Sequence, residues 1–257
     1  MKLTRKSYNR RVYTFGTLIF LAIALISTGF ASWVMSTNKS DKIEGGSFEV
    51  GTITDGSLEF HDLGFEGDTV IKFNPAEGDL DGEIKWDGVN AENLSVTIKG
   101  SITPESSFKE LNIELEKNDT NTKIPAGILA AVEKDYIVLP TCAQEGGVTI
   151  NTSTTIPGSE NKYINVDNTD STKLNFTYTI SFGWGEAFDG KNPSEYLDDA
   201  SNLNPATSKP YTFAEKKEIL MDLRTTIYPS LVGKTEEEIF NGSEDLKFRV
   251  NLTAVAK

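Results

Sequence analysis

The chain has 257 residues and a formal net charge of −13, a length that suits one large all-β domain or two small ones. Five of its 25 Lys and Arg residues lie in the first eleven positions, and beyond Ala31 the other 20 face all 38 acids, which gives −18. So acidic a body excludes nucleic-acid binding, because that binding depends on cations that displace condensed counterions.

The first segment is basic and then apolar, as in a secretory signal peptide. Its cations are followed by an uncharged run over 12–36. Gly29 and Ala31 match the −3 and −1 positions of a signal peptidase site, so cleavage is predicted between Ala31 and Ser32. An uncleaved anchor is the alternative, since about 20 apolar residues can span a bilayer. We therefore expect a secreted or cell-surface protein that meets signal peptidase during export and the membrane only through this segment.

Alternating apolar and polar residues predict that most of the remaining chain forms β-strands. The clearest case runs over 174–182, where every even position is large and apolar and the odd ones are polar. Such a strand buries one face and exposes the other. Strands are expected over 47–53, 57–61, 69–73, 83–86, 94–102, 110–116, 136–139, 147–152, 162–166, 173–184 and 246–255.

An acidic turn is expected between two of these strands. Carboxylates at alternate positions, with Gly82 at the sixth, follow the first half of a calcium loop, although Gly88 stands where a bidentate Glu belongs. Two interpretations stay open: a calcium site and a solvated acidic turn. No other cofactor is expected, and Asp167 with Asp170 forms a weaker acidic cluster. The four candidate ligands are Glu77, Asp79, Asp81 and Glu83.

Few helices are expected. Thr212 with Glu215, and Thr235 with Glu238, form two capping boxes in which a side chain and a backbone N–H bond each other reciprocally. Residues 185–211 are rich in Asn, Asp, Ser and Pro, which predicts a long surface loop. The expected helices cover 125–134, 213–227 and a short stretch that ends near Gly242.

The sequence contains few of the residues that commonly serve in catalytic or metal sites, with one cysteine and one histidine. Cys142 is the sole cysteine, so an intrachain disulfide and a cysteine-based zinc site are excluded. His61 is the sole histidine, which excludes a His-Glu-x-x-His metal site. We interpret His61 as a strand-edge residue and expect no enzyme. The run 233–235 lacks the first glycine of a phosphate loop, because Tyr228 stands at that position.

Many strands with a few helices between them predict a mainly β fold, as an antiparallel β-sandwich of the jelly-roll kind. No repeat period is visible. The expected organisation is a signal peptide over 1–31, an N-terminal arm over 32–46 and one domain over 47–257.

Three short segments resemble a known group of exported proteins. The runs Gly29 to Trp33 and Gly46 to Gly51, and the late strand Leu246 to Ala254, are similar to the TasA/camelysin family of bacterial matrix and surface proteins. The resemblance implies a jelly-roll sandwich that assembles into fibres, with the N-terminal segment of one subunit completing a sheet of its neighbour. The arm 32–46 is the donor-strand candidate.

The expected function is therefore a secreted structural protein of the cell surface or biofilm matrix that self-associates into fibres. The family-consistent alternative is a camelysin-like metallopeptidase, whose metal would rest largely on carboxylates. A surface adhesion or binding module is the third interpretation, since Trp86 and Trp184 could stack on sugars; core packing is the role that we expect for both.

Overall fold

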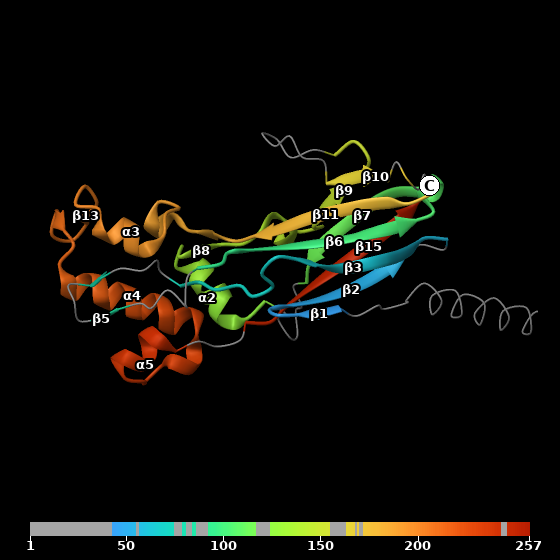
Figure 1. Ribbon diagram of the computed structural model, residues 1–257. Helices are drawn as coiled ribbons and strands as arrows, with labels where there is room; N and C mark the ends of the chain where they lie inside the picture. Colours follow the sequence, from blue (N-terminus) through green and yellow to red (C-terminus); the bar gives the residue numbers. More distant parts are fainter. Residues whose placement is uncertain are drawn as a thin grey trace, which may run out of the picture.

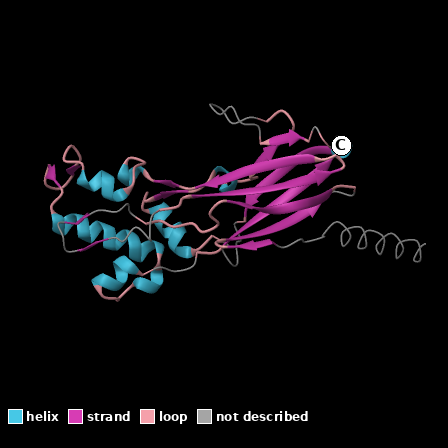
Figure 2. Ribbon diagram, in the orientation of Figure 1, coloured by secondary structure: helices cyan, strands magenta, loops and turns pink. Residues whose placement is uncertain are grey.

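The computed structural model describes residues 43–54, 57–74, 79–80, 84–85, 92–116, 124–154, 163–167, 169, 172–242 and 246–257. Two β-sheets face each other, and the helices gather at one end of them, while the C-terminus lies at the other end (Figure 1; Figure 2). The mainly β class is confirmed. No helix in the ranges given is long and apolar enough to cross a membrane.

The first sheet has five strands in the order β1-β2-β15-β7-β9 and the second has four, in the order β10-β11-β6-β3. Both are mostly antiparallel. The first sheet contains β1 (Ile43–Gly45), β2 (Phe48–Thr54), β15 (Phe248–Ala256), β7 (Phe108–Leu115) and β9 (Val148–Ile150); the second contains β10 (Ile164–Val166), β11 (Leu174–Ser181), β6 (Ser95–Thr103) and β3 (Glu59–Glu66).

One pair corrects the antiparallel prediction. β2 and β15 run parallel, with Phe48 opposite Phe248 and Thr54 opposite Ala254. Both strands enter their sheet from the helical end (Figure 1). For β15 this follows from the chain order, because helices lie between β11 and β15. The jelly-roll wrapping stays a prediction.

The core lies between the two sheets and continues under the helices. Inward positions such as Phe176, Ile98 and Leu252 are at most 2% exposed. Phe182, just after β11, packs on Phe248 of β15 with ring centroids 5.1 Å apart. Burying each such side chain contributes about 2 kcal/mol, so the shared core holds the sheets together.

Several expected strands change in extent. The segment 69–73 forms one isolated bridge, between Lys72 and Asn93, rather than a strand. The strand expected at 57–61 continues to Glu66 as β3. Two pairs of two-residue strands stand in place of the expected strands 83–86 and 136–139 and of the end of 173–184, and a third such pair was not expected. The pairs are β4 (Asp79–Leu80) with β5 (Ile84–Lys85), β8 (Ile137–Val138) with β12 (Gly183–Trp184), and β13 (Leu203–Asn204) with β14 (Lys209–Pro210).

The expected helices are confirmed as α2 (Ala126–Glu133), α4 (Phe213–Ile227) and α5 (Glu236–Asn241). Both capping boxes form, at Thr212 and at Thr235. The surface loop expected at 185–211 is wrong, since it contains the helix α3 (Pro193–Asp198) and buried side chains. Asn192 and the proline after it start this helix: the Asn192 side-chain oxygen accepts a hydrogen bond from the Ser194 N–H, as an N-cap residue does.

Candidate functional site

The feature that bears most on the predicted N-terminal arm is the sheet edge formed by β1. β1 is the terminal strand of the five-stranded sheet and pairs with β2 across a two-residue turn, Gly46 and Ser47. Gly46 has a φ of 55°, and a Cβ there would lie 2.2 Å from the Thr69 carbonyl oxygen. Glycine alone fits this turn. The Ser47 N–H donates to the same oxygen at 2.8 Å, which fixes the turn to the body.

This placement divides the expected arm. Residues 43–45 form β1 on their own chain, so they are unavailable as a donor strand. Residues 32–42 lie outside the described residues, as do the signal segment 1–31 and the cleavage position between Ala31 and Ser32. The donor-strand prediction therefore narrows to 32–42 and stays a prediction.

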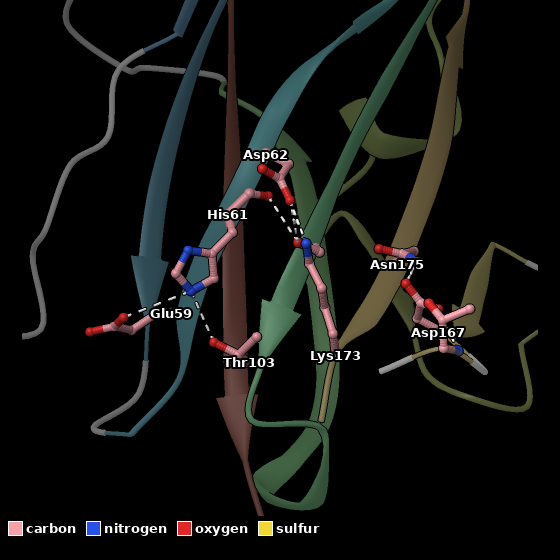
Figure 3. A network of polar contacts seen from close by, with 9 residues as sticks. Glu59, His61, Asp62, Thr103, Asp167, Lys173 and Asn175 are labelled. Carbon is pink, nitrogen blue, oxygen red and sulfur yellow. Dashed lines mark hydrogen bonds and ion pairs between the residues drawn. The ribbon is translucent and has the colours of Figure 1, made fainter. Parts of the chain in front are cut away.

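The edge of the other sheet differs, because its terminal strand β3 is long. β3 has eight residues, whereas β1, β9 and β10 have three each. A network of polar side chains from β3, β6 and the start of β11 lies on its outer face (Figure 3). A long terminal strand can present unpaired backbone groups to other chains, so this edge also bears on the predicted strand addition.

His61 lies on β3, so its strand-edge prediction is confirmed. Its Nε2 atom is 2.9 Å from the Thr103 hydroxyl oxygen and 3.8 Å from a Glu59 carboxylate oxygen (Figure 3). A catalytic relay needs the nucleophile and the acid on different ring nitrogens. Because both partners face the same nitrogen here, the cluster does not have the geometry of a relay.

Asp62 and Lys173 connect β3 to the start of β11. The Lys173 ammonium donates to the Asp62 carboxylate, and so does the Ser101 hydroxyl, at 3.5 Å (Figure 3). The bond and charge of Lys173 hold the pKa of the Asp62 carboxyl below its usual value. Asp62 has a φ of 52°, a conformation that non-glycine residues adopt at a cost. This pair was not predicted from the sequence.

Asp167, from the weaker acidic cluster, is used within the protein. One carboxylate oxygen accepts from the Thr169 N–H at 2.9 Å and from its hydroxyl at 2.6 Å, and the other faces the Asn175 amide at 3.4 Å. This is the Asx-turn pattern that shapes short loops. Its expected companion Asp170 lies outside the described residues.

The calcium interpretation finds no support in the part of the chain that the structure covers. Glu77, Asp81 and Glu83 lie outside it, and of Asp79 only the backbone is described, in β4. Within the described ranges no group of three His, Cys, Asp or Glu side chains is placed to hold a metal ion. The loop therefore stays a prediction.

Three other residues from the sequence analysis have structural roles. Cys142 is 0% exposed, and burial raises the pKa of its thiol to about 11. Trp184 is 5% exposed, which confirms its packing role, while Trp86 is outside the described residues. Thr235 caps α5 and accepts from the Glu238 N–H, so the phosphate-loop likeness of 233–235 reflects a helix cap.

A polar seam, buried at Arg224, Asn74 and Asn192, joins the helices to the sandwich. The Arg224 guanidinium donates to the Asn74 side chain at 2.8 Å and to the carbonyl oxygens of Ile239 and Gly242. The Asn192 amide and the Trp184 indole N–H both donate to one Glu92 oxygen at 2.7 Å, and the same amide reaches the Asn74 carbonyl at 3.5 Å.

The seam was missed in the sequence. Its only signal was an arginine directly after Leu223 on the apolar face of α4, where charged side chains are rarely buried without partners.

No family model, curated protein or solved structure matches this chain. The resemblance to the TasA/camelysin family therefore stays a prediction.

Proposed function

We propose that this protein is an exported structural subunit of the bacterial cell surface or biofilm matrix that assembles into fibres by strand addition. One observation carries the proposal: β1, which directly follows residues 32–42 in the chain, is the terminal strand of a sheet. Residues 32–42 are therefore joined to the body at the edge of that sheet. A strand that leaves one subunit at such a place can pair with an edge of the next.

The length of the donor segment suits this role. Residues 32–42 comprise eleven positions, which span about 36 Å when extended at about 3.3 Å per residue. The longest strands of the body, β6 and β15, have nine residues. The segment is long enough to pair along a whole strand of a neighbour. In an extended strand Trp33 and Met35 would lie on the same face and supply apolar side chains.

The turn that follows β1 is held to the body by hydrogen bonds. Lys247 donates to the Gly46 carbonyl oxygen at 2.7 Å, and the Ser47 hydroxyl accepts from the Ile71 N–H at 3.1 Å. β2, which follows the turn, pairs along its length with β15. A neighbour that holds the segment is thereby linked to the central strands of the first sheet.

The subunit acts without catalysis in this proposal. The His61 cluster lacks the geometry of a relay, and the only thiol is buried with a raised pKa. The peptidase alternative is tested with casein: cleavage by the pure protein that stops with a chelator would replace the structural role, and inactivity with and without added metals supports it.

The test of assembly compares two chains, one from Ser32 to Lys257 and one from Ile43 to Lys257. We expect electron microscopy to show filaments of the first at high concentration and monomers of the second. A free peptide of residues 32–42 should shorten the filaments by competing for the acceptor edge, and the same residues in scrambled order serve as the control. Monomers of both chains at every concentration would contradict the proposal.

A further inference from the structure

The inward and outward alternation of β3 is interrupted by one residue. Leu58 and Phe60 are buried, Leu63 and Phe65 are half-buried against the core, and Glu59, His61 and Glu66 are exposed. Without Asp62, apolar and outward residues would alternate regularly from 58 to 66. Asp62 is therefore a single insertion into a regular edge strand.

The pairing with β6 shows the same insertion. His61 lies opposite Ser101 and Gly64 opposite Lys99, so two residues of β3, Asp62 and Leu63, face the single residue Gly100. Two residues against one define a β-bulge. Gly100 allows it, because a Cβ there would come within 2.6 Å of the Leu63 side chain.

The bulge lies on the open side of the sheet. The Phe182 N–H, just after β11, donates to the Leu94 carbonyl oxygen, just before β6. The even-numbered residues of β6 therefore bond toward β11, and the odd-numbered ones bond toward β3. In an antiparallel ladder the bonded pairs alternate with pairs whose N–H and C=O groups point outward. The backbone groups of Phe60 and Phe65 therefore point away from β6, where they could pair with an added strand.

We infer that the bulge at Asp62 guards the β3 edge against strand addition by a second copy of this chain. It breaks the regular spacing of the outward groups between Phe60 and Phe65, so an incoming strand cannot keep its register along the edge. Lys173 and Ser101 hold the Asp62 carboxylate in place (Figure 3). The bulge disfavours strand addition at the β3 edge only, so other sheet edges remain available for assembly. This inference does not depend on the proposed function.

The test removes the bulge without removing the alternation. Deletion of Asp62 in the chain from Ser32 to Lys257 should give a flat edge that associates. Hydrogen exchange of the peptide 58–66 should then slow at least about tenfold as the protein concentration rises. Exchange of the segment 32–42 is read separately in the same experiment, so failure of the proposed function is distinguishable.

The matched control is Asp62→Gly. It removes the carboxylate and keeps the inserted residue, and glycine accepts a φ of 52° readily, so exchange at 58–66 should stay independent of concentration, as in the unchanged protein. Association of Asp62→Gly equal to that of the deletion would overturn the inference, because charge and not the bulge would then be the guard. A folded deletion variant without concentration-dependent protection would overturn it too.

A further measurement does not depend on the folding of the deletion variant. In the unchanged protein, concentration-dependent protection of 58–66 would show that the edge pairs despite the bulge, which contradicts the inference. In the double variant Glu59→Thr and Glu66→Thr the bulge remains, so no association at this edge is expected. Association there would assign the guard to these charges instead.

Discussion

The Arg224 guanidinium donates a hydrogen bond of 2.8 Å to the side-chain oxygen of Asn74, across 150 residues of sequence. Arg224 lies on α4 and is 2% exposed, while Asn74 directly follows the core residue Phe73. The bond joins the helical end of the molecule to the sandwich. Because a buried charge is tolerated only with its partners in place, we expect the helices and the sheets to unfold together.

Replacing Arg224 with Met should destabilise the protein by about 3 kcal/mol, since the oxygens of Asn74, Ile239 and Gly242 lose their donor inside the protein. Chemical denaturation followed by circular dichroism measures the change. Lys209→Met, on an exposed residue, should change the free energy of unfolding by less than about 0.5 kcal/mol. Equal effects of the two substitutions would mean that the seam does not stabilise the fold.

Gly127 lies where α2 meets α4, and a Cβ there would come within 2.2 Å of the Ile227 carbonyl oxygen. Gly127→Ala should therefore cost about 2 kcal/mol from overpacking, although alanine is the better helix former. Gly64→Ala is the control, because the Gly64 Cβ position has nothing within 4 Å. Thermal unfolding of both variants checks this, and a stabilised Gly127→Ala would disprove the close helix contact.

The Thr212 N–H and hydroxyl bond the Glu215 carboxylate and hold its pKa below the ordinary 4.5. A pKa depressed by folding stabilises the protein above the unfolded pKa, and this stability is lost as pH falls through the folded value. The midpoint temperature of thermal unfolding should decrease as the pH is lowered below 4.5. This decrease should be less steep in Glu215→Ala. Glu218→Ala, on the same helix but outside the capping box, should keep the original slope; a loss of slope there would remove the assignment to the cap.

Cys142 should resist thiol reagents in the folded protein. Its thiol is fully buried with a pKa of about 11, so at pH 8 only about a thousandth of it is the reactive thiolate. Labelling should be at least about 100-fold slower in buffer than in denaturant. Equally rapid labelling in both conditions would show that the β11 side of the core opens readily.

The elements with strong local signals could be predicted from the sequence. The apolar positions of 174–182 form the buried face of β11 and its extension, and the capping box at Thr212 marks the start of α4. These features depend on residues that are close together in the chain. Periodicity and capping chemistry are therefore sufficient to find them.

The features that were missed depend on distant parts of the chain. The parallel pairing of β2 with β15 follows from the end at which the chain re-enters the sheet, which no local pattern records. In the sequence Arg224 looks like an ordinary helix residue, because its hydrogen-bond partners belong to other parts of the chain. The insertion of Asp62 shifts the alternation of apolar residues between Phe60 and Leu63. It was missed because the strand predicted there ends at His61.

Hydrogen exchange of residues 32–42, in assembled and in monomeric protein, tests the central claim most directly. Strand addition predicts that the backbone N–H groups of this segment are protected by at least about 100-fold in the assembled form, because they pair with a neighbour's sheet, and are unprotected in the monomer. Exchange at the same rapid rate in both forms would contradict the account, since the subunits would then join by some other surface.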